Sequence, residues 1–261
     1  MNNLIIGNTS QLSYFFPENY ESISSRNIDF SMVNNKKYDR IYLLFAEQRT
    51  FLNENVDFFN QINFDYTVSV IDKVKDYCNK VVIYSTSELW NAYDGEVSVD
   101  LPFKYNFSPY IKSKENLCNY INLNKDKYNN VIIIYPFNFN SVFRKDGFLF
   151  GKIFKSLLKN EPIEIGDVNF YRDIIHPKII VNESIKTNSD LLIGSGELHN
   201  IKIFIEDLFK LYNKNLNDYI IINTNNNLQN KRSGYYSKIK YSSYDEILKL
   251  TLQDLYEYKT S

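Results

Sequence analysis

The chain has 261 residues, a formal net charge of −1 at pH 7, and a composition of 44% hydrophobic and 23% charged residues. This length suffices for one large domain or two closely joined ones, and the lack of a basic field argues against nucleic acid as a partner. Two cysteines, Cys78 and Cys118, are too few for a disulfide framework or a metal site. The sequence shows no signal peptide and no apolar run of bilayer-spanning length, so we expect a cytoplasmic protein with no membrane partner.

Residues 3–6 predict a first strand, and Gly7 to Ser13 form the turn that follows it. A turn that binds a dinucleotide has glycine at three positions, which Gly7, Ser10 and Ser13 occupy here. Each serine adds a side chain where the backbone approaches the pyrophosphate. By itself the turn is an ordinary connection from a strand to a loop. Its place at the start of the chain, ahead of the motifs below, favours a cofactor turn.

The next stretch is short for a nucleotide-binding half. Residues 20–25 predict a second strand, and residues 28–33 predict a further short element. No acidic residue stands at the end of the second strand, which argues against NAD, because a carboxylate there binds the ribose of that cofactor. Arg26 follows this strand and is placed to meet the 2′-phosphate of NADP, although a solvated surface arginine explains it equally well.

Two stronger elements follow. Residues 38–46 predict a strand, and residues 58–74 predict an amphipathic helix. We expect the apolar stripe of this helix to be core. The stripe consists of Phe59, Ile62, Tyr66, Val70, Ile71 and Val74.

The apolar run of residues 81–84 predicts a buried parallel strand, which gives way at Ser85 to hydroxyl and carboxylate side chains. In an open α/β sheet, ligands bind at the carboxyl ends of the strands. Thr86 and Glu88 are therefore expected at the place where chemistry occurs.

A helix is predicted after Pro109, and Tyr110 and Lys114 share one of its faces because they are four residues apart. Phenols are poor bases at neutral pH, but an ammonium one helical turn away favours the phenolate. Tyr110 can then exchange a hydroxyl proton while a nicotinamide carries a hydride. Taken alone, this spacing also fits an exposed helical turn, since the chain contains 22 tyrosines. The preceding strand with its Ser-Thr-Ser-Glu end favours the catalytic interpretation.

Together the two motifs resemble the extended short-chain dehydrogenase/reductases that modify nucleotide sugars. The string Ser-Thr-Ser-Glu-Leu at residues 85–89 is similar to the catalytic strand end of GDP-mannose 4,6-dehydratases, and nucleotide-sugar decarboxylases carry nearly the same string. The resemblance implies an α/β fold, with a Rossmann-type doubly wound parallel sheet and a smaller α/β substrate-binding part. We expect the cofactor part in residues 1–137, joined by a later strand around residues 178–193, and the substrate part mainly in residues 138–261.

The resemblance also implies a cofactor, NADP or NAD. The chain departs from the family at both later glycines of the first turn and at Phe45 and Glu47, which stand where small residues are usual. It also lacks a longer helix and strand on the adenosine side, while Asn63 lies where the family has a polar residue near the cofactor. The cofactor residues implied by the resemblance are Gly7, Ser10, Gln11, Leu12, Arg26, Tyr110 and Lys114.

Residues 131–135 predict another buried strand, and the stretch after it resembles the segment that lines the sugar-nucleotide site of GDP-mannose dehydratases. The resemblance implies that Asn138 hydrogen-bonds the substrate and that Arg144 lies at its cofactor or phosphate edge. The stretch from Arg172 to Lys178 is similar to the Arg-Asp-x-x-His-x-Lys pattern of the family. Because a guanidinium suits bidentate binding of a diphosphate, Arg172 is the expected phosphate ligand, with a structural salt bridge to Asp173 as the alternative.

The remaining predictions complete the chain. We expect helices over residues 148–158, 201–212 and 241–256, and a loop over residues 223–231. We assign Asp173 and His176 to the scaffold, and Ser87 to the substrate-binding residues.

The resemblance implies oxidation at carbon 4 of a nucleotide-linked sugar, with a GDP-sugar favoured, in the synthesis of a surface polysaccharide. In this mechanism Tyr110 removes the hydroxyl proton, Lys114 tunes Tyr110 and holds the nicotinamide ribose, and Thr86 hydrogen-bonds the sugar. Glu88 then removes the proton at carbon 5 so that water leaves carbon 6, which is the chemistry of a 4,6-dehydratase. We expect no metal and a homodimer or larger homo-oligomer.

Two alternatives stay open. A 4-keto-sugar reductase or an epimerase needs the other three catalytic residues but not Glu88. A non-catalytic homologue that acts as a binding or scaffold subunit is favoured by Ser10, Ser13 and Phe45, whereas the complete catalytic set argues against it.

Overall fold

The computed structural model describes residues 2–144, 147–223 and 234–260, and the chain forms two compact units. The first unit contains Met1–Ala92, Val99–Pro136 and Val181–Leu192. The second unit contains Tyr93–Ser98, Phe137–Ile180 and Ile193–Ser261. The chain therefore passes from one unit to the other at residues 136/137, and also at residues 92/93, 98/99, 180/181 and 192/193.

The first unit is built on a six-stranded sheet with the order β11-β6-β4-β3-β1-β2. Neighbouring strands from β2 to β6 run parallel, and all six residues of β6 are buried. This arrangement confirms the predicted doubly wound parallel sheet. The strands are β1 (Asn3–Ile6), β2 (Glu21–Ile23), β3 (Tyr38–Leu43), β4 (Cys78–Tyr84), β6 (Val131–Pro136) and β11 (Leu191–Ile193).

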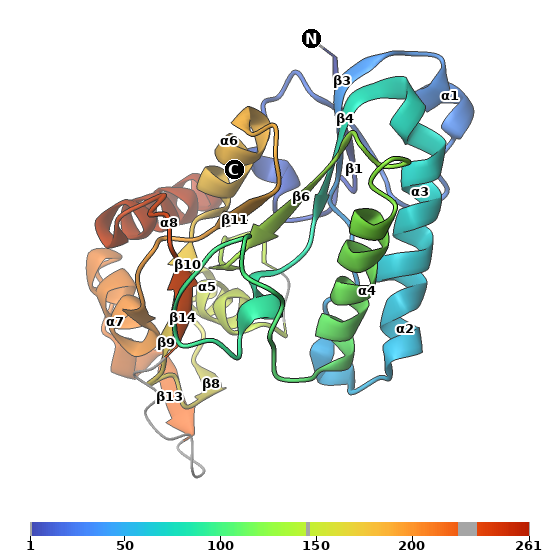
Figure 1. Cartoon of the computed structure of the whole chain (residues 1–261). Helices are drawn as coiled ribbons and strands as arrows, with labels where there is room; N and C mark the ends of the chain where they lie inside the picture. The colour runs from blue at the N-terminus through green and yellow to red at the C-terminus, as the bar shows by residue number, and fades with distance from the viewer. Residues whose placement is uncertain (1, 145–146, 224–233, 261) are drawn as a thin grey trace. The chain divides into compact units, whose positions relative to one another are not determined.

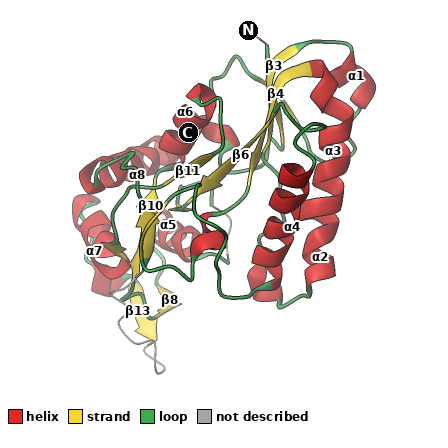
Figure 2. Cartoon of the chain, viewed as in Figure 1, coloured by secondary structure: helices red, strands yellow, loops and turns green. Residues whose placement is uncertain are grey.

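Helices cover both faces of this sheet (Figures 1 and 2). On one face lie α2 (Val56–Asn60), the π-helical segment η3 (Gln61–Tyr66), α3 (Thr67–Val74) and α4 (Pro109–Leu123). On the other face lies α6 (Pro177–Lys186). Arg40 of β3 fixes the end of α6, because its guanidinium donates to the carbonyl oxygen of Ser184 at 3.2 Å and to Oδ1 of Asn188 at 2.9 Å.

The predicted helix 58–74 exists, but a π-helical turn in its middle changes which residues face the sheet. The sequence pattern placed Ile62 on the buried stripe, yet Ile62 is 39% exposed and its neighbour Asn63 is 1% exposed. A π turn holds one more residue than an α turn, so it shifts the inward face by one position. The prediction for Ile62 was wrong for this reason, while Phe59, Val70, Ile71 and Val74 are buried as expected.

The connection from β1 to β2 contains only a three-residue 3-10 helix, η1 (Ser13–Phe15). Phe16 and Tyr20 of this connection pack their rings on Tyr42 of β3, with centroid distances of 4.7 and 6.0 Å. These rings cover a part of the sheet where a βαβ unit places a crossover helix. The next element, predicted over residues 28–33, is the short helix α1 (Phe30–Asn34), which Asp29 caps.

The second unit packs three helices around its own apolar core. These helices are α5 (Leu149–Lys159), α7 (Ile201–Leu211) and α8 (Tyr244–Thr260), and each confirms a predicted helix. Four short strand pairs complete the unit. They are β5 (Gly95–Val97) with β14 (Tyr235–Ser237), β7 (Asn138–Phe139) with β10 (Ile174–Ile175), β8 (Ile163–Gly166) with β13 (Ile220–Asn223), and β9 (Tyr171–Arg172) with β12 (His199–Asn200). Of the predicted loop 223–231, Asn223 ends β13 and the rest lies outside the described residues.

Asp173 organises the middle of the second unit. Its carboxylate is 1% exposed and accepts hydrogen bonds from the backbone N–H groups of Ser195 at 2.6 Å, Gly196 at 3.2 Å and Ser237 at 3.0 Å. Burial raises the pKa of this carboxyl to about 6 despite these donors. A Cβ at Gly194 would overlap the carboxylate, so only glycine fits at this position. Asp173 therefore has the scaffold role assigned from sequence.

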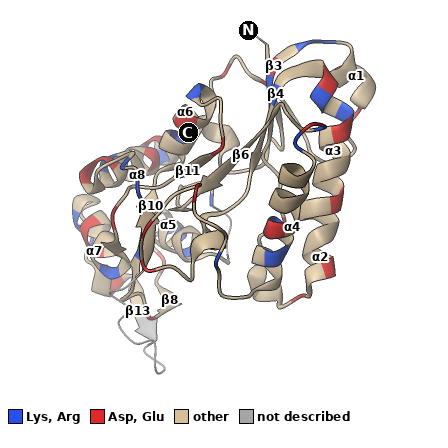
Figure 3. Ribbon diagram, in the orientation of Figure 1, with Lys and Arg blue, Asp and Glu red and all other residues tan. Residues whose placement is uncertain are grey.

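Charged residues of both signs are mixed along the helices of each unit (Figure 3). Within the described part of the chain, no helix combines the length and the apolar character that crossing a bilayer requires.

Candidate functional site

The carboxyl end of β4 turns directly into the short helix η5 (Ser87–Trp90). Thr86 caps this helix, because its Oγ1 accepts a hydrogen bond from the N–H of Glu88 at 3.2 Å. A hydroxyl has a proton to donate and a second lone pair besides the one used in this cap. The side chain of Glu88 is half-buried in the same turn. Thr86 and Glu88 thus stand at the strand end where the sequence placed them.

Two buried side chains fix the position of η5. Leu89 and Trp90 are both 0% exposed. The indole Nε1 of Trp90 donates to the carbonyl oxygen of Leu101 at 3.0 Å, and its ring meets Phe103 and Tyr135 edge-on, each at 5.1 Å. Because these contacts lock the last residue of η5, Glu88 is presented from a rigid turn.

Helix α4 brings the predicted tyrosine and lysine to the same place. Ser108 caps the helix by accepting from the N–H of Ile111 at 3.1 Å. Tyr110 lies in the first turn, half-buried, with its ring edge-on to Phe59 at 6.0 Å. One turn later Lys114 is 3% exposed, and its Nζ donates to the carbonyl oxygen of Tyr84 at 3.1 Å. Since Tyr84 is the last residue of β4, the amine lies at the strand end that carries Thr86 and Glu88.

Burial controls the charge of Lys114. It lowers the pKa of the amine from 10.5 to about 8, and the nearby Cys118 opposes this shift only in part. Burial also raises the pKa of the Cys118 thiol to about 11, so the thiol stays protonated at neutral pH and donates to Oγ of Ser85 at 3.2 Å. With a pKa near 8, Lys114 remains mostly an ammonium at pH 7. The chain therefore supplies a positive charge at the end of β4, one helical turn along α4 from Tyr110.

Asn63 links this helix to the loop that follows β3. Its Oδ1 accepts from the N–H of Glu47 at 2.8 Å, and its Nδ2 donates to the carbonyl oxygen of Glu47 and to Oγ of Ser113, both at 3.0 Å. Ser113 in turn donates to the carbonyl oxygen of Tyr110 at 2.7 Å. Sequence reasoning held Asn63 only as a polar position near the cofactor. The local sequence gave no signal for its burial, because Asn60, Gln61 and Asp65 around it are polar as well.

The first turn of the chain fits a cofactor only in part. Gly7 has φ +115°, and a Cβ on it would lie 3.1 Å from the carbonyl carbon of Leu44, so glycine is required here. Oγ of Ser13 donates to the carbonyl oxygens of Ser10 at 2.6 Å and Asn8 at 2.9 Å. The three-residue η1 is too short to offer the helix N-terminus that usually receives a pyrophosphate.

The other predicted cofactor residues differ in exposure. Gln11 is 8% exposed and Leu12 is 4% exposed, so little of either side chain is accessible. Arg26 is exposed just past β2, where its backbone N–H donates to Oγ of Ser24 at 3.1 Å. Taken with the turn at Gly7, the residues fit the nicotinamide end of a dinucleotide at β4 and α4 better than its adenosine end at β1 and β2.

Three predicted substrate residues lie in the second unit. Asn138 of β7 is exposed and pairs in register with Ile174, two residues beyond Arg172. The guanidinium of Arg144 stacks on Phe148 with 3.8 Å to the ring centroid and lies 6.0 Å from that of Phe139.

Arg172 is exposed at the end of β9. Its guanidinium lies 4.9 Å from the ring centroid of Phe170, and one Nη donates to the carbonyl oxygen of Tyr171 at 2.7 Å. A guanidinium has five donors, so this contact leaves most of them for an anion. Ser87, the fourth predicted substrate residue, belongs to the first unit and is 1% exposed. Its burial gives no support to a substrate contact.

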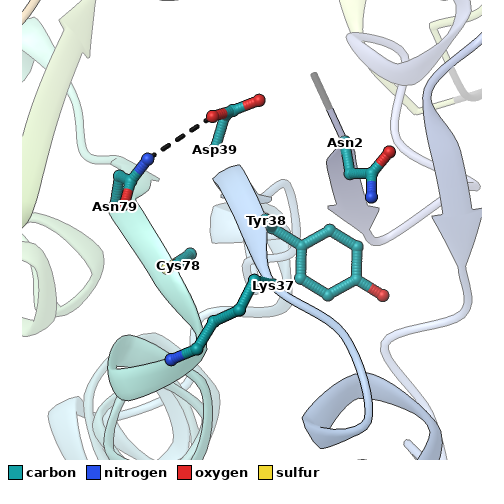
Figure 4. A pocket seen from close by; sticks show the side chains of 6 residues that line it. All are labelled: Asn2, Lys37, Tyr38, Asp39, Cys78 and Asn79. Carbon is teal, nitrogen blue, oxygen red and sulfur yellow. Dashed lines mark hydrogen bonds between the residues drawn. The ribbon is translucent and has the colours of Figure 1, made fainter.

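A hollow of about 430 Å³ opens at the opposite edge of the sheet, at the amino ends of the strands (Figure 4). Cys78 in this hollow has its pKa raised to about 12 by burial, so its thiol is not reactive at neutral pH. No cluster of metal-ligating side chains occurs among the described residues. The hollow is lined by Asn2, Lys37, Tyr38, Asp39, Cys78 and Asn79. It lies away from the strand ends that carry the candidate catalytic residues.

No protein-family model matches this sequence, and no curated protein matches it. Solved structures are similar to it over the whole chain. RMD from Pseudomonas aeruginosa, in complex with NADPH, has a TM-score of 0.75 at 12% identity, and the match covers 100% of each chain. dTDP-glucose 4,6-dehydratase from Bacillus anthracis, in complex with NAD, has a TM-score of 0.74 at 16% identity over 99% of this chain and 97% of that one. UDP-glucuronic acid 4-epimerase from Bacillus cereus, in complex with UDP-glucuronic acid and NAD, has a TM-score of 0.76 at 17% identity over 99% and 100%. At these identities the likeness establishes a shared Rossmann-type fold.

Proposed function

We propose that this protein is an enzyme that uses NAD or NADP to modify a nucleotide-linked sugar. The proposal rests on Thr86 and Glu88 just beyond the carboxyl end of β4, and on Lys114, whose Nζ donates to the carbonyl oxygen of Tyr84 at that end; Tyr110 lies one turn before Lys114 on α4. The fold likeness supports it, because similar structures include a dehydratase and an epimerase of nucleotide sugars that were solved with NAD.

The proposed chemistry begins at a hydroxyl of the sugar. Thr86 would orient this hydroxyl, and Tyr110 as a phenolate would accept its proton. A bound nicotinamide would supply the acceptor for the hydride from the same carbon. The ammonium of Lys114, held by the carbonyl oxygen of Tyr84 at 3.1 Å, favours the phenolate of Tyr110 one turn away. The residues at this end also suit the nicotinamide ribose, toward which Lys114 would donate.

Glu88 decides between the finer alternatives. In a 4,6-dehydratase a carboxylate at this position takes the proton from carbon 5 of the 4-keto sugar, so that water leaves carbon 6. A 4-keto-sugar reductase or an epimerase needs no such base. The presence of Glu88 in the rigid η5 turn favours the dehydratase, and the resemblance to GDP-mannose 4,6-dehydratases favours a GDP-sugar.

Arg172, Arg144 and Asn138 are the proposed substrate ligands. Both guanidiniums are stacked on aromatic rings, which restricts their rotamers and reduces the entropy lost when they bind a diphosphate. Guanidinium and phosphate form paired, charge-assisted hydrogen bonds, so two arginines suit the diphosphate of a nucleotide sugar.

The test is a panel of GDP-, UDP- and dTDP-sugars incubated with the protein and each cofactor in heavy water. A dehydratase produces a 4-keto-6-deoxy sugar that has lost water and gained deuterium, which mass spectrometry detects. Glu88→Gln should stop the loss of water yet leave cofactor binding intact. An unchanged dehydration rate in that variant would remove Glu88 from the mechanism.

Glu115→Gln provides the matched control, because Glu115 lies on α4 beside Lys114 but its carboxylate binds Tyr105 at 2.8 Å and Lys112 at 2.6 Å. Its rate should stay within about threefold of wild type, since surface ion pairs contribute little. A folded protein that binds neither cofactor would instead support the non-catalytic alternative.

The remaining expectations concern the setting of the enzyme. We infer a homodimer or larger homo-oligomer that works in the cytoplasm in polysaccharide synthesis, on the basis of the family resemblance. Light scattering on the purified protein tests the first part, because a monomeric mass at micromolar concentration would contradict it.

A further inference from the structure

The carboxyl edge of the sheet in the first unit has a second end, formed by β1 and its two neighbours. β1 lies between β2 and β3, so the direction of strand progression reverses there. In open α/β sheets a ligand binds in the crevice at such a switch point. Three segments follow the strands at this switch point, where such a crevice is expected: the turn at Gly7 after β1, the loop at Ser25 after β2, and the loop at Phe45 after β3.

Two aromatic side chains connect the borders of this crevice. Tyr66, the last residue of η3, donates its hydroxyl to the carbonyl oxygen of Ser25 at 2.5 Å. Its ring packs on Phe45 with a centroid distance of 5.3 Å. The ends of β2 and β3 are thereby tied together by Tyr66 and Phe45, although β1 separates these strands in the sheet.

The pair also lies close to the turn at Gly7. A Cβ on Gly7 would come within 3.3 Å of the backbone nitrogen of Phe45, so the turn and the Phe45 loop are in contact. Phe45 and Tyr66 are only partly exposed, and burial raises the pKa of Tyr66. The pair is therefore packed into the structure, with its hydroxyl already satisfied.

A dinucleotide needs three features at this end of the sheet. It needs a polar side chain at the end of β2 for the adenosine ribose, a helix N-terminus for the pyrophosphate, and space beside the backbone of the first turn. Here no carboxylate directly follows β2, and the backbone carbonyl of Ser25, two residues beyond the strand, accepts from Tyr66. Only the short η1 follows β1. The first turn is closed internally by Oγ of Ser13.

We propose that this protein holds its nicotinamide cofactor through the nicotinamide half, and that the Phe45–Tyr66 pair occupies the adenosine side of the crevice. This inference rests on the proposed function, since it concerns the same cofactor. The pyrophosphate and adenosine contribute little binding energy, so the cofactor exchanges freely with solvent.

The first experiment compares two ligands that differ only in the adenosine half. NADH and reduced nicotinamide mononucleotide are titrated into the full chain by calorimetry or nicotinamide fluorescence. We expect dissociation constants within about tenfold of each other, which corresponds to about 1.4 kcal/mol. NADH binding more than roughly a hundredfold tighter would overturn the inference and leave the proposed function standing. If neither ligand binds to the folded protein, the proposed function itself fails.

The second experiment removes the occupant of the crevice. Phe45→Ala should improve NADH affinity by roughly fivefold or more, by opening space for the adenosine half, and should leave the affinity for the mononucleotide unchanged. Phe64→Ala is the matched control, because Phe64 lies on η3 two residues before Tyr66 but packs its ring on Tyr120, with a centroid distance of 5.5 Å. The control should change neither affinity.

Two results with Phe45→Ala would contradict the proposal. A selective loss of NADH affinity would mean that Phe45 stacks on the adenine, and an unchanged NADH affinity would mean that Phe45 does not fill the adenosine side. Circular dichroism confirms that the variant is folded. If it does not fold, the ratio of the two affinities in the wild-type protein still decides the question.

Discussion

The two ends of the crevice along the sheet of the first unit are built differently. At the β4 end, capped and buried segments carry the hydroxyl of Thr86 and the carboxylate of Glu88, and the amine of Lys114 is bound to the last residue of the strand. At the β1 end, the ring of Tyr66 packs on Phe45, its hydroxyl donates to Ser25, and Ser13 donates to Ser10 within the first turn. We propose that these contacts occupy the side where a dinucleotide usually binds. A catalytic step requires particular side chains in fixed positions, whereas the affinity for a cofactor can fall gradually as single contacts are lost. A chain can therefore keep one end complete while the other is simplified.

The largest effect on turnover is expected at the β4 end of the sheet. Tyr110→Phe removes the proton acceptor while leaving the ring against Phe59, so turnover should fall by roughly 10³-fold. The affinity for NADH should stay within about threefold of wild type, because the nicotinamide still meets Lys114. Steady-state rates and cofactor titration measure the two quantities. Full activity in this variant would end the account of the β4 end as catalytic.

Lys114→Met tests the electrostatics of the same end through stability. The pKa of the folded amine is about 8, below its ordinary value of 10.5, so between these pH values the unfolded chain binds a proton that the native chain has released. The lysine therefore destabilises the native protein fully below pH 8, and this cost disappears as the pH rises toward 10.5.

At pH 7 the methionine variant should be more stable than wild type by on the order of 3 kcal/mol, less the cost of the unpaired carbonyl of Tyr84. The advantage should shrink steadily between pH 8 and 10. Urea unfolding at several pH values gives the free energy of unfolding of wild type and of Lys114→Met as functions of pH. The buried tyrosines titrate in both proteins, so their contribution cancels in the difference between the two curves. A difference that stays constant with pH would contradict the assigned pKa.

Asn63 joins the two ends, because it binds both the loop after β3 and helix α4. Asn63→Ala leaves the N–H and carbonyl of Glu47 without these partners, so the free energy of unfolding should fall by about 2 kcal/mol. Asn116→Ala is the control, since Asn116 makes a single bond to Asn60 at 3.1 Å on the rim of the same helix pair. It should cost less than about 1 kcal/mol. Equal losses in the two variants would show that Asn63 has no special linking role.

The smallest effect, on cofactor affinity, is expected at the β1 end of the sheet. Arg26 is exposed, and charge pairs in water are worth little, so Arg26→Ala should change the ratio of NADPH to NADH affinity by less than about threefold. The same titrations used for the mononucleotide measure this ratio. A tenfold or larger loss of NADPH preference would place the 2′-phosphate at Arg26 and show that the protein does bind the adenosine half.

Much of this architecture follows from local patterns in the sequence. The apolar runs at residues 81–84 and 131–135 became central strands, and the helical stripe before residue 256 became α8 with Ile247 and Leu255 buried. The spacing of Tyr110 and Lys114 predicted a shared helix face, and Lys114 was found at the end of β4. Such features depend on periodicity and on strand ends, which neighbouring residues specify.

Other features depend on residues far apart in the chain. The π turn that buries Asn63 in place of Ile62 is matched to partners at Glu47 and Ser113, so the local pattern gave no sign of it. In the same way, the passage of Tyr93–Ser98 into the second unit depends on pairing with β14 near the other end of the sequence.

The sequence by itself determined the type of sheet, the position of the strand end that carries Thr86 and Glu88, and the residue types there, because these follow from short-range periodicity and from the rule that parallel strands end together. Only the tertiary structure decided what fills the β1 end of the crevice. Tyr66 reaches Ser25 across 41 positions of sequence and packs on Phe45. Contacts of this kind are selected by packing and hydrogen bonding among folded segments, and no local pattern encodes them.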